Sequence, residues 1–178
     1  MSKEQPNPAP EISVRCAFDE MVPLPEIKPN PRNPNTHPPG QLNLLAKIIE
    51  HQGWRAPILV SKLSGLIVSG HGRYEAALLL GVESAPVNFQ DFDSEEDEFA
   101  HLVADNRLAE ISEMDTTSLK ELLIEMDTGA IDMDLTGFTE NDLEELMTQF
   151  HVPEDNQELD EEEMGKTESE CPKCGFKW

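Results

Sequence analysis

The sequence contains no apolar run that approaches the roughly 20 residues needed to cross a membrane. Its first ten residues also lack the apolar segment of a secretory signal. It has only three cysteines, two of them in Cys-x-x-Cys spacing, and this odd number does not suit a disulfide framework. We therefore expect a cytoplasmic protein that makes no membrane contact, and not a small secreted domain stapled by disulfides.

Basic residues are also scarce. The chain has 13 Lys and Arg against 36 Asp and Glu, which gives a formal net charge of −23. The excess is concentrated in residues 111–178, which hold 20 acidic and 4 basic residues. Non-specific affinity for DNA depends on Lys and Arg side chains that displace counterions. We therefore expect DNA to be contacted only indirectly or through a partner protein.

The most informative stretch covers residues 68–81. A short apolar run ends there at Gly70 and Gly72, and a strong helix-forming run begins near Arg73. This order predicts a strand, a tight turn and a helix whose first turn presents free backbone N–H groups. Such groups and the helix dipole attract anions, and His71 and Arg73 add polar side chains. The turn is therefore a candidate phosphate site; a turn whose polar side chains merely face water is the alternative.

The remaining pattern predicts an α+β fold with a helical extension. The expected elements are a strand in residues 12–24 that includes Cys16, a proline-rich loop in 27–40, a helix in 41–51, strands in 57–61 and 66–68 joined as a hairpin, a helix from about 73 to 80, a strand in 85–89, and helices opened by Ser94, by Asp115 or Thr116, and by Thr139. The helix after Ser94 is expected to turn Phe99, Leu102 and Val103 inward.

Residues from about 12 to 110 resemble the ParB N-terminal / sulfiredoxin-like superfamily. The marks of the resemblance are Pro29-Asn-Pro-Arg-Asn-Pro34, Pro57-Ile-Leu-Val60, the glycine loop with Arg73 and Ala76, and Ala104-Asp-Asn-Arg107 on a later helix. The resemblance implies a small mixed-sheet domain in residues 11–110 that binds a nucleotide. It also implies a stand-alone ParB-like nuclease domain protein of the phage or mobile-element type.

ParB-type members hold nucleotide phosphates in the glycine loop and use a later carboxylate and amide to hold Mg²⁺. The resemblance thus implies a nucleoside triphosphate, CTP or ATP, bound with Mg²⁺. The implied cofactor-binding residues are Gly70, His71, Gly72, Arg73, Asp105, Asn106 and Arg107. Asp105 and Asn106 are the implied metal ligands, because Mg²⁺ prefers hard oxygen ligands that it shares with phosphates.

The glycine loop departs from both branches of the superfamily. His71 stands where ParB proteins have a glutamate, and Gly72 stands where they have an arginine, so CTP preference and hydrolysis stay open. The run Arg73-Tyr74-Glu75-Ala76 matches the sulfiredoxin loop. However, His71 takes the place of the catalytic cysteine, and without a thiolate we expect no sulfiredoxin activity.

The two ends of the chain differ in composition from the middle. Residues 1–10 are expected to be disordered, 111–150 to form an amphipathic helical extension, and 151–170 to form a disordered acidic linker before a Cys-x-x-Cys tail in 171–178. Cys171 and Cys174 are half of a zinc knuckle, since zinc takes four ligands. His151 is a possible third ligand, and the alternatives are a zinc ion shared between two chains or a free tail that docks on another protein.

Three functions stay open. The first is a nucleotide-dependent switch or NTPase in DNA modification, partition or processing, with a methyltransferase as an example of a partner. The second is a Mg²⁺-dependent nuclease in which Asp105 and Asn106 hold the metal while Glu75 and His71 act as catalytic residues. The third is a non-catalytic adaptor that docks through the acidic helices and the tail. A homodimer is compatible with each.

Overall fold

The computed structural model describes residues 10–148. Its elements in chain order are β1 (Glu20–Pro23), η1 (Leu24–Glu26), α1 (Pro39–Gln52), β2 (Ile58–Ser61), β3 (Ile67–Ser69), α2 (His71–Leu80), β4 (Ser84–Gln90), α3 (Glu95–Ile111), α4 (Thr116–Met126), η2 (Met133–Thr136) and α5 (Glu140–Thr148). The predicted α+β class and the predicted order of helices and strands are confirmed.

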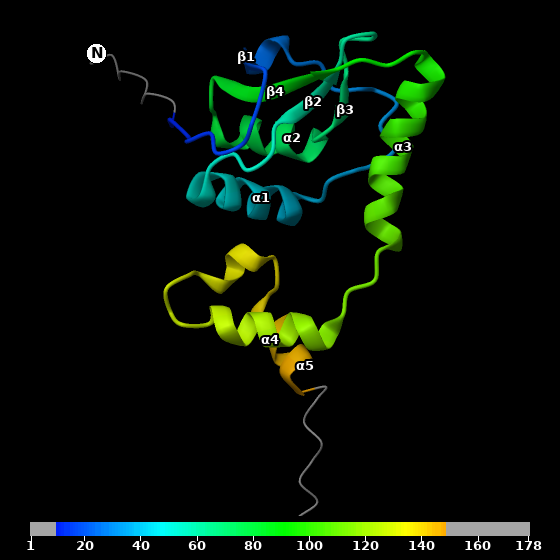
Figure 1. The fold of residues 1–178 in the computed structure, drawn as a ribbon. Coiled ribbons are helices and arrows are strands. Elements are labelled where there is room, and N and C mark those ends of the chain that lie inside the picture. Colours follow the sequence, from blue (N-terminus) through cyan, green and yellow to red (C-terminus); the bar gives the residue numbers. More distant parts are fainter. Residues whose placement is uncertain (1–9, 149–178) are drawn as a thin grey trace, which may run out of the picture. The chain divides into compact units, whose positions relative to one another are not determined.

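The four strands form one mixed sheet in the order β1-β4-β2-β3 (Figure 1). β2 pairs antiparallel with β3, as the predicted hairpin requires, and parallel with β4. β1 pairs antiparallel with β4, with Glu20 opposite Val87. A crossover through β3 and α2 therefore separates the two parallel strands, and it carries the predicted phosphate turn.

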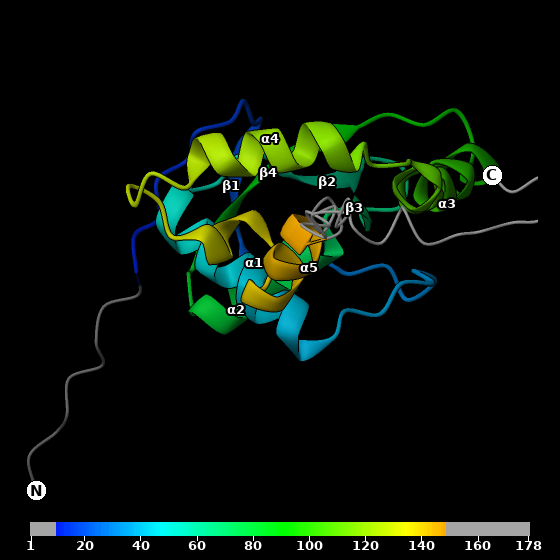
Figure 2. The same cartoon turned by 90° about the horizontal axis from the view of Figure 1, so that it is seen from below.

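Helices α1 and α2 lie on the same side of the sheet (Figure 1 and Figure 2). Ala76 and Ala77 of α2 are fully buried, because their small side chains let the helix approach Ile58 and Ile67 of the sheet closely. Ile49 of α1 joins the same cluster. The apolar positions of these helices therefore fix the turn between β3 and α2 against a rigid support.

The segment before β1 is less regular than predicted. Val14 forms only an isolated bridge to Trp54, and continuous pairing starts at Glu20. Cys16 consequently lies in a bend and not in a strand, although it is partly buried against the core. α1 begins two residues earlier than predicted, at Pro39, since proline is favoured in the first turn of a helix.

Helix α3 makes its contacts through one face only. It packs mainly against β3, and Leu102 is buried as predicted. The prediction that Val103 points inward is wrong, because its side chain is 55% exposed. Neighbouring residues on a helix point about 100° apart, so a helix that packs on a single strand cannot bury both.

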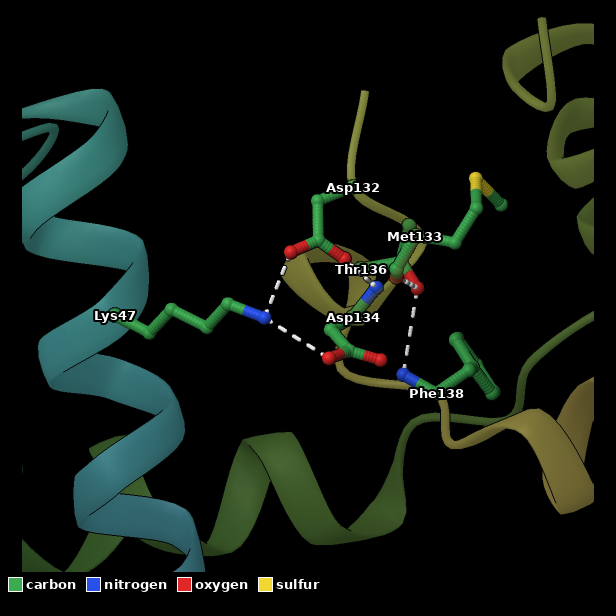
Figure 3. A network of polar contacts seen from close by, with 6 residues as sticks. All are labelled: Lys47, Asp132, Met133, Asp134, Thr136 and Phe138. Carbon is green, nitrogen blue, oxygen red and sulfur yellow. Dashed lines mark hydrogen bonds and ion pairs between the residues drawn. The ribbon is translucent and has the colours of Figure 1, made fainter. Parts of the chain in front are cut away.

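An ion-pair cluster holds the segment after α4 to α1. Lys47 Nζ lies 2.8 Å from Asp132 Oδ2 and 2.9 Å from Asp134 Oδ2 (Figure 3). The two aspartates raise the pKa of Lys47, and Lys47 in turn lowers the pKa of Asp132. Leu135, directly after Asp134, is buried. The acidic extension therefore has a specific contact with the domain, although exposed ion pairs are screened by salt.

The described residues divide into two compact units, with the boundary between Glu140 and Asn141. α5 falls almost wholly in the second unit and begins one residue after Thr139, close to its predicted start. The finer division of the chain into five segments stays a prediction. None of the helices within residues 10–148 is long and apolar enough to cross a membrane.

Gly53 provides a test of the fold. It ends α1 with φ 77° and ψ −179°, a conformation available essentially to glycine alone, and a Cβ added there would collide with the carbonyl oxygen of Ser13. Gly53→Ala should therefore lower the free energy of unfolding by at least about 2 kcal/mol, measured by urea unfolding.

Two other glycines serve as matched controls. Gly65 also has a positive φ of 71° but open space at its Cβ, so Gly65→Ala reports backbone strain without a collision. Gly40 lies in α1 with no atom near an added Cβ, so Gly40→Ala should be neutral or stabilising. Equal losses for Gly53→Ala and Gly65→Ala would contradict the predicted collision.

Candidate functional site

The glycine turn connects β3 to α2 with a single residue. β3 ends at Ser69, Gly70 has φ 94° and α2 begins at His71, two residues earlier than predicted. Tyr74 N donates to Gly70 O at 3.0 Å, which closes the first turn of the helix. The backbone N–H groups of residues 71–73 therefore lie in that first turn, where they have no partner within the helix. No side chain caps them.

One pocket of about 210 Å³ brings the two halves of the predicted site together. The glycine turn and the start of α2 form one part, and Asp105 and Asn106 of α3 form another. The complete lining is Asn33, His37, Leu45, Val68, Ser69, Gly70, His71, Gly72, Arg73, Asp105 and Asn106. The pocket thus gathers residues from the proline-rich loop, α1, β3, α2 and α3.

Arg73 supplies the positive charge of the pocket. Its guanidinium lies against Gly70, because a Cβ added to Gly70 would come within 3.0 Å of Arg73 Nη2. Burial lowers the pKa of Arg73, and Asp105 opposes that effect. Its Nε atom is buried without a hydrogen-bond partner. A buried N–H donor without a partner is costly, so the site favours a ligand that brings an acceptor.

The carboxylate and the amide of α3 are each held in place by a neighbour. Ser69 Oγ donates to Asp105 Oδ2 at 2.8 Å, and Asn106 Nδ2 donates to Leu102 O at 2.9 Å. The second carboxylate oxygen and the amide oxygen are the atoms suited to a cation. Within residues 10–148 no cluster of three or more His, Cys, Asp and Glu side chains could hold a metal. A cation would therefore need oxygens from a ligand or from water.

His71 is engaged in a structural hydrogen bond. Asn30 N donates to His71 Nε2 at 3.1 Å, and Asn30 Oδ1 accepts from Arg32 N at 2.9 Å. Burial, with a smaller contribution from His37, lowers the pKa of His71 to about 4. The imidazole is therefore neutral near pH 7 with its proton on Nδ1. Its predicted catalytic role stays a prediction, and the atom that would act as a base already holds the proline-rich loop.

The proline-rich loop closes over the turn at further points. His37 lies against Gly72, where an added Cβ would meet His37 Cε1 at 3.2 Å. Arg32 places its guanidinium carbon 3.8 Å from the centre of the Phe99 ring on α3. A Cβ at position 72 would therefore require the His37 ring to shift by a few tenths of an ångström, which explains why a small residue suits this position.

Not all predicted site residues meet in this pocket. Glu75 is half-buried but does not line it, and exposed Arg107 pairs with Glu110 at 2.6 Å. Cys171 and Cys174 lie outside the described residues. The sequence reading missed Ser69, although its position directly before Gly70 offered a signal, since a residue at the end of β3 must face the same turn.

Comparison with known proteins decides the family. Residues 9–106 match the model of the ParB N-terminal domain. The chain belongs to the ParB N-terminal domain family. It is also 40% identical over 65 residues to the ParB-like nuclease domain-containing protein YnaK of Escherichia coli (strain K12), a match that covers 36% of this chain and 74% of the relative.

Two solved structures are similar to this ParB-like chain. The C-terminally truncated chromosome-partitioning protein ParB from Caulobacter crescentus, complexed with CTP-gamma-S, superposes with a TM-score of 0.58 at 19% identity over 76% of this chain and 79% of that chain. Sulfiredoxin from Arabidopsis thaliana gives a TM-score of 0.39 at 25% identity over 47% of this chain and 94% of its own length. The first likeness confirms the ParB fold.

The buried His71 makes stability depend on pH. Its pKa is about 4 in the folded chain and near 6.5 when unfolded, so only the unfolded chain gains a proton as the pH falls through this window. Stability should therefore fall by about 1 kcal/mol per pH unit between pH 6 and 4.5 from this residue alone. The measurement is urea unfolding of the wild type and of His71→Gln at pH 7 and at several values between pH 6 and 4.5.

The difference in free energy of unfolding between the wild type and His71→Gln reports on His71 alone, because both proteins have the same carboxylates. The advantage of the wild type at pH 7 should shrink steadily toward pH 4.5. An advantage that does not change with pH would show that the imidazole is not held neutral by burial.

Proposed function

We propose that this ParB-like domain binds the phosphates of a nucleoside triphosphate, CTP or ATP, together with Mg²⁺. One observation carries the proposal: the phosphate turn at Gly70–Arg73 and the carboxylate–amide pair at Asp105 and Asn106 line the same pocket. The two features are far apart in the sequence. Each would be a common surface feature alone, but together they offer an anion site next to a cation site.

The phosphate end of the ligand suits the start of α2. Backbone N–H groups of the first turn and the positive end of the helix dipole both favour an anion. Arg73 contributes a charge whose Nε atom is buried without a partner. A phosphate oxygen would satisfy that donor, and a charge-assisted hydrogen bond is about twice as strong as a neutral one.

The metal end explains how so acidic a chain would accept a triphosphate. Asp105 lies in the pocket and would repel bare phosphates. A Mg²⁺ ion between them removes this repulsion, because the metal binds one or two protein oxygens and takes the rest from phosphates and water. Asp105 and Asn106 offer two such oxygens. Nucleotide binding should therefore require Mg²⁺.

The size of the pocket limits what it encloses. Its volume of about 210 Å³ is below the range of about 300–1,000 Å³ typical of sites that enclose a whole drug-sized ligand. It therefore suits the phosphates, with the base and sugar lying over its rim. The choice between CTP and ATP would then be made outside the pocket.

The wider role we propose is a nucleotide-dependent function in cytoplasmic DNA transactions, such as modification, partition or processing, of a phage or mobile element. The relatives support it: one is named for a ParB-like nuclease domain, and the fold neighbour is a chromosome-partitioning protein crystallised with a CTP analogue. With a net charge of −23, this chain would reach DNA through a partner, such as a methyltransferase, and not by its own surface.

A Mg²⁺-dependent nuclease is the second candidate, and the name of the Escherichia coli relative favours it. Asp105 would be the metal ligand in that reaction too. The described residues supply one carboxylate to the pocket, whereas two-metal sites need several, and Glu75 does not line it. The nucleotide switch therefore has the better support.

Thermal denaturation in the presence of nucleotides tests the proposal. CTP, ATP, ADP and GTP would each be titrated with and without Mg²⁺. A ligand at about 100 times its Kd adds about 2.7 kcal/mol to stability and so raises the Tm by several degrees. Arg73→Ala should abolish the rise, whereas Arg107→Ala, which removes an exposed arginine outside the pocket, should keep it.

Asp105→Asn gives a second test, because it should change nucleotide binding in opposite directions with and without Mg²⁺. The amide can still accept the hydrogen bond from Ser69, but the charge is gone. Nucleotide binding should weaken in the presence of Mg²⁺ and strengthen in its absence. No rise in Tm with any nucleotide for the wild type would overturn the proposal.

We also propose that Cys171 and Cys174 bind zinc, completed by ligands from another part of the chain or from a partner. Zinc favours thiolates, and the Cys-x-x-Cys spacing is that of half a zinc knuckle. The purified full chain should contain up to one zinc per molecule by elemental analysis. The Cys171→Ser/Cys174→Ser variant should contain none, and Cys16→Ser should keep it. Equal zinc in all three proteins would contradict the assignment.

A further inference from the structure

The face of α3 that meets the β2–β3 hairpin carries three residues, Glu98, Leu102 and Asp105. Their spacing of four and then three residues places them on one side of the helix. Leu102 is buried, and the two acidic residues lie on either side of it along the helix. Each acidic side chain accepts hydrogen bonds from serine hydroxyls of the hairpin.

Glu98 is the stronger of the two anchors. Its side chain is only 2% exposed. Ser61 Oγ donates to Glu98 Oε2 at 2.6 Å, and Ser64 Oγ donates to Glu98 Oε1 at 2.7 Å. Ser61 Oγ in turn accepts from Leu63 N at 3.1 Å within the hairpin turn. Both carboxylate oxygens are thus used, and the described partners of this buried group are hydroxyls and not a cation.

The other anchor belongs to the candidate nucleotide site. Ser69 at the end of β3 donates to Asp105, whereas the partners of Glu98 lie at the turn between β2 and β3, so the two anchors hold α3 to the two ends of β3. Two anchors seven residues apart on the helix restrain it from sliding along the hairpin. Beyond Asp105 the apolar residues of the helix are not packed, because Leu108 and Ile111 are each at least 55% exposed.

We propose that Glu98 is a positioning residue for the nucleotide site. Its hydrogen bonds to Ser61 and Ser64 hold α3 where Asp105 and Asn106 line the pocket with the glycine turn. This inference rests on the proposed nucleotide function but assigns a role to a residue that does not touch the ligand. Burying a carboxylate is costly, and an apolar side chain would fill the same space, but it would not fix the position of α3 along the hairpin.

Glu98→Gln tests the role with little change in volume. The amide keeps one acceptor oxygen and loses the other, so the protein should still fold while the anchor weakens. Amide hydrogen exchange, read by mass spectrometry without nucleotide, should be about tenfold faster in the second half of α3 and at residues 69–73, since a lost hydrogen bond to a charged group corresponds to about one order of magnitude or more. Exchange in α1 should stay unchanged.

The nucleotide readout uses the Mg²⁺ concentration that gives half of the thermal shift at fixed CTP or ATP. Glu98→Gln should raise this concentration about tenfold, because the metal ligands are no longer held in place. Two variants are controls. Glu96→Gln removes an exposed acid from the same helical turn, and Leu123→Ala destabilises the chain through a buried residue of α4. Neither should change the Mg²⁺ requirement.

The outcomes separate this inference from the proposed function. If the wild type responds to no nucleotide, the proposed function fails, and hydrogen exchange alone decides whether Glu98 holds α3 and the turn. Unchanged exchange in Glu98→Gln overturns the inference. So does faster exchange with an unchanged Mg²⁺ requirement in a protein that binds nucleotide, because Glu98 would then only stabilise the helix.

Discussion

The structure depends on the conformation of one residue, Gly70. Its positive φ lets the chain turn from the last residue of β3 directly into the first residue of α2. A longer connection would move the first turn of α2 away from the end of the strand. As it stands, Ser69 faces α3 while the start of α2 faces the same pocket, so one glycine brings the strand, the turn and both helices to a common point.

Charge sets the second constraint. The chain carries 36 acidic residues, yet Arg73 is the one cationic side chain placed in the described pocket beside Asp105. A long-range field of this sign disfavours an anion, so any phosphate affinity must come from short-range contacts with backbone N–H groups and Arg73. Burial strengthens those contacts because it lowers the local dielectric. Under the proposed function, such a site would bind a metal–phosphate complex better than a free anion.

The sequence predicts features that depend on neighbouring residues, but not contacts between residues that are far apart in the chain. Ser94 and Asp115 cap α3 and α4 as predicted, because a cap depends on residues within one turn. The carboxylate–amide pair was placed beside the glycine turn only through the family resemblance. The hydrogen bond between Asn30 and His71 joins residues that are far apart in the sequence, so no motif spacing predicts it. The same holds for the hydrogen bonds that the buried Glu98 accepts from Ser61 and Ser64. The prediction that Val103 points inward is wrong because the periodicity of apolar residues predicts a helix, but not how many faces of that helix are packed against other elements.

The hydrogen bond of His71 bears on the glutamate that the family resemblance implies at this place in the glycine loop. A glutamate at this place could act on water, whereas a neutral imidazole buried under the proline-rich loop has its Nε2 atom occupied by Asn30. Nucleotide binding as proposed would use the backbone of the turn, Arg73 and a metal, none of which requires a particular side chain at position 71. Hydrolysis needs a group that can activate water. Exchange of the acid for a histidine would therefore weaken hydrolysis while it leaves binding intact, which suits a switch that is reset by release of the nucleotide.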